Sequence, residues 1–302
     1  MKRDVYICEV GPRDGLQNAK HLMATEAKKA WIRALAAAGL EEIEVGSFVP
    51  PKLIPAMADT GEIVAFARTL PGVKVVALAP NLKGFQRALQ AGVHKVTFPV
   101  SASRKHSESN VRMTPEQMVE EVRKCAQHPH PGVELEGAVS TAFGCTMQGD
   151  VPEDDVVRIA AQLAEFCDAV ALADTVGYGN PAQVRRVFRR VKNEIGNKLE
   201  GAHFHNTRGL GLANALAAYE EGVRAFDSSL GGLGGCPFAP GASGNVITED
   251  LVFMFESMGV STGIDLDRLM AARRLMVEVL PQEQVYGHFA LAGVPKGFRA
   301  AA

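Results

Sequence analysis

The sequence lacks the features that would assign the chain to a membrane, a secreted or a nucleic-acid-binding class. Lysine plus arginine number 32 and aspartate plus glutamate 34, so the formal net charge of −2 gives no electrostatic reason to expect nucleic acid as a partner. No apolar stretch approaches the ~18 residues that suggest a membrane span. Lys2 and Arg3 are followed by too short an apolar run for a signal peptide, so we expect no membrane partner.

Cysteine pairs are also missing. The five cysteines, at positions 8, 125, 145, 167 and 236, are odd in number, scattered, and form no C-x-x-C pair. This pattern predicts a reduced, cytoplasmic protein without a disulfide framework. The hydrophobic fraction of 47% and the charged fraction of 22% are normal for a globular enzyme with a full core.

Short apolar runs alternate with longer segments of helical periodicity. The runs predicted to be strands are 5–10, 42–45, 73–79, 95–98, 133–139, 169–172, 201–205 and 225–228. The segments predicted to be helices are 25–38, 61–70, 82–91, a helix opened by residues 114–116, then 152–166, 181–191, 210–222, 245–258 and 265–280. The polar segment 101–113 is predicted to be a loop, and the tail after residue 280 is rich in glycine and proline.

Eight strand–helix units at a spacing of about 30 residues predict an α/β protein with a parallel sheet. Eight units can close into a (β/α)8, or TIM, barrel. An open doubly wound sheet is the alternative, and the absence of G-x-G-x-x-G after the first strand disfavours it. We predict a single catalytic domain over residues 1–302, in which about 265–302 form a short C-terminal helical extension and tail.

Polar side chains gather at the predicted carboxyl ends of the strands, the rim that carries the chemistry of barrel enzymes. His203 and His205 lie two residues apart, so in a strand both imidazoles point to one face and can reach one cation. The alternative is two histidines that are satisfied by neighbouring carbonyls. Asp14, after the first strand, would add a carboxylate, and a mixed imidazole and carboxylate set favours Mg²⁺ or Mn²⁺.

Three loops have both a structural and a functional interpretation. The run 11–15 (Gly-Pro-Arg-Asp-Gly) is typical of a tight turn, but Arg13 could also serve as a fixed cation for a developing oxyanion. The glycine-rich run 231–235 is an ordinary loop or a phosphate cradle, and the Cys236 thiol beside it is idle or a mobile acid/base. Taken alone, Cys236 is better interpreted as idle. The segment 101–110 is a solvated loop, a lid, or a phosphate contact through Arg104 and Lys105.

A metal-free imine mechanism needs a lysine near the catalytic rim. Lys74 and Lys95 begin the third and fourth predicted strands, which places them at the opposite end of the barrel. The sequence therefore disfavours Schiff-base chemistry.

At these positions the sequence resembles the hydroxymethylglutaryl-CoA lyase family, within the superfamily of metal-dependent aldolases and condensing enzymes. The resemblance covers about residues 4–280. It includes the motifs Glu9-Val-Gly-Pro-Arg-Asp-Gly-Leu-Gln-Asn18, Ile43-Glu-Val45, Ser47-Phe-Val49, Asn81-Leu-Lys-Gly-Phe85, Asp174-Thr175, His203-x-His205, Gly232-Leu-Gly-Gly-Cys-Pro237 and Gly241-Ala-Ser-Gly-Asn245. The last two motifs are the most specific, because they separate the lyases from the wider superfamily.

The resemblance implies a (β/α)8 barrel that cleaves (S)-3-hydroxy-3-methylglutaryl-CoA to acetyl-CoA and acetoacetate with a divalent cation. It implies these metal ligands: Asp14, His203, His205 and Asn245. Arg13 would stabilise the enolate of the acetyl thioester, and Cys236, now given a function, would transfer a proton. Glu44 would support Arg13, and Asp174 would line the pocket. The family also suggests a homodimer and a place in leucine breakdown.

The sequence departs from the family pattern on either side of the substrate. Family members commonly have Asp and then Thr-Tyr-Gly after the second histidine, where this chain has Asn206-Thr-Arg208-Gly, and many have Glu at the position of Arg104. Citramalyl-CoA or a longer 3-alkyl-3-hydroxyglutaryl-CoA is therefore an alternative substrate, and we hypothesise that Arg208 or Arg104 meets a CoA phosphate or a substrate carboxylate. A condensing acyltransferase that uses acetyl-CoA, and a non-catalytic binder of metal or CoA, are less favoured alternatives. Condensing enzymes usually carry additional C-terminal domains, and every expected catalytic position is filled.

Overall fold

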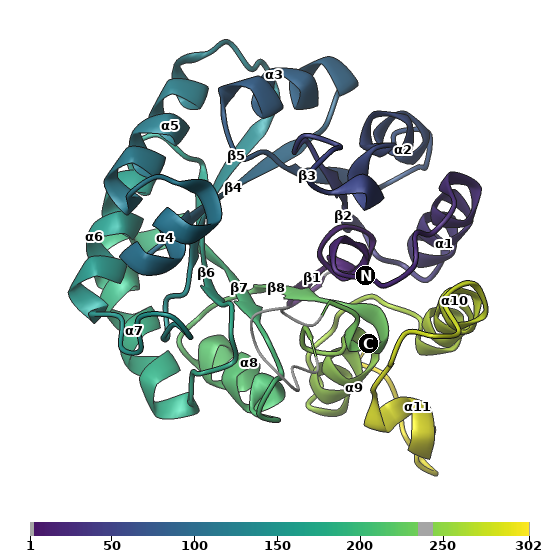
Figure 1. Cartoon of the computed structure of the whole chain (residues 1–302). Helices are drawn as coiled ribbons and strands as arrows, with labels where there is room; N and C mark the ends of the chain where they lie inside the picture. The colour runs from purple at the N-terminus through teal and green to yellow at the C-terminus, as the bar shows by residue number, and fades with distance from the viewer. Residues whose placement is uncertain (1–2, 235–243, 302) are drawn as a thin grey trace.

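A closed barrel of eight parallel strands forms the centre of the protein. The computed structural model describes residues 3–234 and 244–301, and in this part of the chain each strand pairs with the next while β1 pairs with β8. The strands are β1 (Tyr6–Glu9), β2 (Glu42–Ser47), β3 (Lys74–Leu78), β4 (Lys95–Ser101), β5 (Glu134–Ser140), β6 (Ala169–Asp174), β7 (Leu199–Phe204) and β8 (Ala225–Ser228). Figure 1 looks into this barrel, and the predicted (β/α)8 architecture is confirmed.

Helices surround the barrel on all sides (Figure 1). They are α1 (Thr25–Ala37), α2 (Thr60–Ala67), α3 (Leu82–Ala91), α4 (Arg104–Val111), α5 (Pro115–Gln127), α6 (Glu153–Ala164), α7 (Pro181–Ile195), α8 (Gly211–Glu220), α9 (Thr248–Ser257), α10 (Leu266–Val279) and α11 (His288–Ala292). The predicted start of α5 is confirmed, because Thr114 and Gln117 form a reciprocal capping box. Among the described residues, no helix has both the length and the apolar character needed to cross a bilayer.

The prediction of a loop at 101–113 is wrong. Helix α4 occupies most of that segment, and the Ser103 hydroxyl caps it by accepting the N–H of His106 at 3.3 Å. Ser107 is its one buried residue. Because α4 covers so little apolar surface, the sequence carries no hydrophobic periodicity that would have revealed it.

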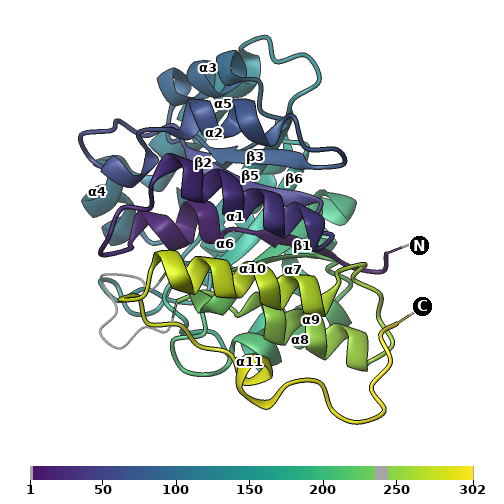
Figure 2. The same cartoon turned by 90° about the vertical axis from the view of Figure 1, so that its right-hand side faces the viewer.

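The C-terminal extension packs on the outside of the barrel. Helix α10 contacts α1 and α9, and α11 contacts α9 (Figure 2). Asp250 of α9 accepts the backbone N–H groups of His288 and Phe289 at 3.0 and 2.7 Å, so it fixes the first turn of α11. The predicted helix at 265–280 is confirmed, and α11 lies in the segment that was predicted to be a glycine- and proline-rich tail.

Charged side chains, rather than branched apolar ones alone, fill the amino-terminal half of the barrel. The Nζ atom of Lys95 lies 2.8 Å from Oε1 of Glu42 and 2.7 Å from Oε2 of Glu136. Burial disfavours the charged ammonium, but Glu136 and Glu42 outweigh it and hold the pKa of Lys95 well above its usual value. Lys74 pairs with Glu134 at the same end, so both lysines lie away from the carboxyl rim, as predicted.

We expect Lys95→Met to destabilise the barrel by about 3–5 kcal/mol, because it leaves buried carboxylates without their counter-charge. Urea unfolding measures the change. Lys124→Met, which removes an exposed lysine that pairs with Glu121, is the control and should leave the midpoint nearly unchanged. Equal midpoints for Lys95→Met and the wild-type protein would contradict a structural role for the ion pairs.

Candidate active site and metal centre

A single π-helical turn, Gly11–Gly15, brings Arg13 and Asp14 to the mouth of the barrel directly after β1. The Val10 carbonyl accepts the N–H groups of Arg13 and Asp14 at 3.1 and 2.7 Å, which closes the turn. The Arg13 guanidinium then lies between two carboxylates. Its Nε donates to Glu44 at 2.6 Å and its Nη1 donates to Asp14 at 2.7 Å.

Burial and the Arg13 cation together set the charge of the two carboxyl groups, with opposite results. Burial disfavours the Asp14 carboxylate, but Arg13 and the imidazoles of His205 and His203 outweigh burial and hold the pKa of Asp14 well below its usual range. For Glu44 burial prevails over Arg13 and raises the pKa to about 7. Asp14 is therefore an anion at neutral pH in a largely buried site, and the charged form is the one that binds a metal.

The paired imidazoles meet Asp14 at the carboxyl end of β7. Nε2 of His205 lies 3.7 Å from Oδ2 of Asp14, and the ring centroids of His203 and His205 are 5.2 Å apart. One ligand atom from each of these three residues lies within 4.8 Å of the others, so all three could bind one ion. The geometry brings together groups that are almost 190 residues apart in the sequence.

Asn245 reaches the same place from the segment that precedes α9. Its backbone forms an antiparallel bridge with His205, and Val246 donates its N–H to the Phe204 carbonyl at 2.8 Å. The side-chain Nδ2 donates to Asp14 at 2.7 Å, while Oδ1 is buried and accepts no hydrogen bond. A buried oxygen without a partner, beside a carboxylate and two imidazoles, fits the ligand set of a hard divalent cation.

Asp227 of β8 orients His203, a contact that the sequence analysis missed. Nδ1 of His203 lies 3.0 Å from Oδ2 of Asp227, which leaves Nε2 as the nitrogen that could bind a cation. Burial would lower the pKa of His203, but the hydrogen bond and the charge of Asp227 raise it overall. The only sequence signal was a carboxylate inside a predicted strand, and β7–β8 pairing places it opposite His203.

Asp174 occupies the end of β6 but faces its own loop. Its two oxygens accept the N–H groups of Tyr178 and Gly179, each at 2.9 Å, and the side chain is fully buried. Burial raises its pKa despite these two bonds. The carboxylate thus holds the β6–α7 turn, and its predicted place in the pocket lining stays a prediction. Cys236 lies outside the described residues.

The two arginines that depart from the family pattern lie on different parts of the rim. Nη1 of Arg208 donates to the carbonyls of Val176 and Gly177 at 3.1 and 3.2 Å, and its guanidinium carbon lies 4.5 Å from the centroid of the Tyr178 ring. Arg104 instead donates twice to Glu116, at 2.9 and 3.0 Å.

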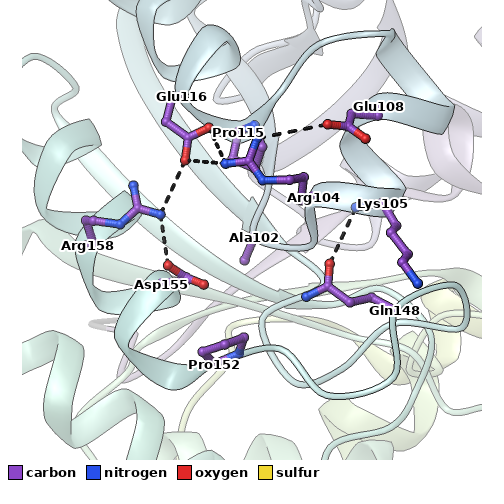
Figure 3. Close-up of a pocket in the computed structure, with 10 residues that line it drawn as sticks. All are labelled: Ala102, Arg104, Lys105, Glu108, Pro115, Glu116, Gln148, Pro152, Asp155 and Arg158. Atoms are coloured by element: carbon purple, nitrogen blue, oxygen red, sulfur yellow. Dashed lines mark hydrogen bonds and ion pairs between the residues drawn. The ribbon is translucent and has the colours of Figure 1, made fainter.

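The Arg104 side chain lines a cavity of about 460 Å³ between α4, α5 and α6 (Figure 3). Three basic and three acidic side chains line it, namely Arg104, Lys105, Arg158, Glu108, Glu116 and Asp155. Glu116 pairs with both arginines (Figure 3). Because these charges cancel, the cavity offers little excess positive charge for a phosphate.

A closed parallel barrel with a carboxylate and two imidazoles at its carboxyl rim is the arrangement of a metal-dependent barrel enzyme. The HMGL-like family model matches residues 4–276. A 3-hydroxy-3-isohexenylglutaryl-CoA/hydroxymethylglutaryl-CoA lyase of Pseudomonas aeruginosa is 41% identical over 93% of this chain and 94% of its own length. The chain belongs to the HMGL-like family, as the resemblance predicted.

Other relatives agree. A hydroxymethylglutaryl-CoA lyase of Bacillus subtilis is 40% identical over 91% of this chain and 93% of its own length. Among solved structures, an HMG-CoA lyase from Acinetobacter baumannii in complex with coenzyme A and 3-methylmalate superposes with a TM-score of 0.92. It is 40% identical, and the match covers 98% of this chain and 97% of that one.

We expect Asp227→Ala to weaken Mn²⁺ binding by about 10–100-fold, because His203 loses the contact that fixes its ring. Counting free Mn²⁺ by electron paramagnetic resonance gives the dissociation constant without any assay of turnover. Asp267→Ala, on the exposed face of α10, is the control and should bind like the wild type. A wild-type dissociation constant for Asp227→Ala would show that this contact does not orient a ligand.

Proposed function

We propose that this carbon–carbon lyase cleaves (S)-3-hydroxy-3-methylglutaryl-CoA to acetyl-CoA and acetoacetate with Mg²⁺ or Mn²⁺. The observation that carries the proposal is the meeting of Asp14, His203 and His205 beside the Arg13 guanidinium. Family membership and relatives of this named activity support it. The solved complex of a relative with coenzyme A and a hydroxy diacid points to the same class of substrate.

The proposed ligands of the cation are Asp14, His203, His205 and Asn245. When bound, a divalent cation lowers the pKa of a chelated hydroxyl group and orients it for proton loss. The four ligands come from the ends of β1 and β7 and from the segment before α9, and the ion pair with Arg13 keeps Asp14 charged. Asp227 fixes the ring of His203, so the protein supplies a rigid set of donors.

Cleavage of the C2–C3 bond requires the movement of two electron pairs. The hydroxyl proton passes to a general base, and the electron pair of the O–H bond forms the ketone of acetoacetate. The electrons of the broken C2–C3 bond move onto the acetyl thioester as an enolate. Arg13 is proposed to stabilise that enolate, and one such contact typically lowers a barrier by ~3–4 kcal/mol. A proton then returns to the acetyl carbon, for which we propose His203 or Cys236. Glu44 holds Arg13 in place at 2.6 Å, and Asp174 is proposed to shape the pocket.

We also propose that residues 1–302 act as one catalytic domain in a cytoplasmic homodimer, with leucine breakdown as the pathway. Packing of α10 and α11 against α1 and α9 supports the single domain. A longer 3-alkyl-3-hydroxyglutaryl-CoA is the second candidate substrate. It is favoured by the isohexenyl compound in the name of one relative.

Incubation of the protein with Mg²⁺ and (S)-3-hydroxy-3-methylglutaryl-CoA should release acetoacetate. Exhaustive chelation should abolish the release, and added Mn²⁺ should restore it. A panel with citramalyl-CoA and longer 3-alkyl esters measures kcat/KM for the alternatives. Full turnover after chelation would contradict the metal mechanism, and no acetoacetate together with cleavage of a longer ester would reassign the substrate.

We expect Arg208→Gln to raise KM for the CoA ester about tenfold, if its free nitrogens meet a CoA phosphate, since one charged hydrogen bond contributes about 1.5 kcal/mol. An N-acetylcysteamine thioester lacks the phosphates, so its KM should not change. Arg104→Ala tests the second arginine by the same two KM measurements. Unchanged KM for every thioester in both variants would end the phosphate hypothesis.

A further inference from the structure

Glu9 is a fully buried carboxyl group at the end of β1, outside the set of side chains that meet at the mouth of the barrel. Its Oε1 accepts the N–H of Gly11 at 3.0 Å and the N–H of Leu230 at 2.9 Å. Its Oε2 lies 2.7 Å from the Thr248 hydroxyl. One side chain therefore joins three segments that are up to 239 residues apart in sequence.

Each of these partners leads directly to the candidate metal centre. Gly11 opens the π-helical turn that carries Arg13 and Asp14. Leu230 stands two residues after β8, and Thr248 opens α9 three residues after Asn245. Glu9 thus bonds to the chain on both sides of residues 235–243, at Leu230 before them and at Thr248 after them.

The close fit around Glu9 shows that this arrangement is specific. A Cβ atom on Gly11 would lie 2.5 Å from Oε1 of Glu9 and 2.9 Å from the Trp31 ring, so no larger residue fits there without displacing the carboxyl group. Trp31 is itself fully buried. The turn that holds Asp14 is packed against Glu9 as well as bonded to it.

A second buried carboxyl group acts on the neighbouring residue. Oε2 of Glu249 accepts the N–H of Gly231 at 3.0 Å, and its Oε1 accepts from Nε of Arg273 in α10 at 2.7 Å. Two successive N–H groups, of Leu230 and Gly231, are therefore bound by two different glutamates. Glu249 follows Thr248 at the start of α9, so the same short stretch of helix secures both contacts.

We propose that Glu9 is a positioning residue of the metal centre. Its carboxyl group ties the turn that bears Asp14 to the segments at Leu230 and Thr248, and so holds Asp14 next to Asn245. The inference rests on the proposed function, since it assumes that these two residues bind the cation. Glu9 acts through its neighbours and has no part in proton transfer.

Burial favours the neutral acid form of Glu9. Burial raises the pKa of Glu9 to about 8, against the opposing bonds from Thr248, Leu230 and Gly11, and the charge of nearby Glu249 adds to the rise. The Thr248 hydroxyl has one hydrogen and also lies 2.9 Å from the Ser228 hydroxyl. A hydroxyl group can donate to a carboxylate or accept from a carboxylic acid, so the contact between Thr248 and Glu9 is compatible with the neutral form that burial favours.

The decisive measurement is Mn²⁺ affinity, determined without substrate for Glu9→Gln and Glu9→Leu. A glutamine amide can accept both N–H groups and donate to Thr248, so Glu9→Gln should bind Mn²⁺ within about threefold of the wild type. Glu9→Leu keeps the volume but loses all three contacts, and should raise the dissociation constant at least about tenfold and lower kcat more than it raises KM. Wild-type affinity in Glu9→Leu, or an equal loss in both variants, would overturn the proposal.

Thr248 provides an independent pair of variants if Glu9→Leu does not fold. Thr248→Ser keeps the hydroxyl and should bind Mn²⁺ like the wild type, whereas Thr248→Val should bind severalfold more weakly. Equal affinities in the two variants would overturn the role assigned to this contact. Because binding is measured without substrate, failure of the proposed lyase activity would leave these results interpretable.

Thermal unfolding tests the neutral state of Glu9. The pKa of Glu9 is raised in the folded protein. The contribution of neutral Glu9 to the free energy of unfolding is therefore complete below the usual glutamate pKa of 4.5 and is lost as the pH rises through about 8. The melting temperature of the wild type should therefore fall relative to that of Glu9→Gln between about pH 5 and 8.5. If the melting temperatures of the wild type and of Glu9→Gln changed in parallel with pH, a neutral Glu9 would be contradicted.

Discussion

The ion pairs of Arg13 are the interaction on which the mouth of the barrel depends. A carboxylate as buried as Asp14 would normally take up a proton, and the guanidinium 2.7 Å away prevents this. Glu44, at 2.6 Å from the same guanidinium, keeps it from turning away. Removal of one partner from such a buried set leaves an uncompensated charge, so these residues must be present together. The proposed cation ligand, Asp14, and the proposed partner of the enolate, Arg13, therefore depend on the same ion pair.

Much of this arrangement could be predicted from the sequence because it follows from local patterns. Apolar periodicity gave the order of strands and helices, and parallel pairing then brought all carboxyl ends to one rim. Arg13, Asp14, His203 and His205 stand at strand ends, so their meeting at the rim follows from topology alone. The position of Lys74 and Lys95 at the opposite end follows by the same rule.

Other features could not be predicted, since their partners are distant in sequence or their local pattern is weak. Helix α4 buries a single serine, so its sequence resembles a solvated loop. Asp227 is one carboxylate in a strand until pairing sets it beside His203. Glu9 is one polar residue in a short apolar run, and its partners Leu230 and Thr248 lie 221 and 239 residues away. Spacing rules carry no information over such separations.

The backbone bridge between His205 and Asn245 has a consequence for how the centre can diversify. The main chain at residue 245 is held by its pairing with the end of β7, whatever side chain it carries. An amide, a carboxylate or an imidazole could therefore be presented from the same place without rearrangement of the barrel. Point substitution at this one position would alter the total charge and the softness of the donors. For the metal site proposed above, a single substitution at residue 245 would therefore shift the preferred ion.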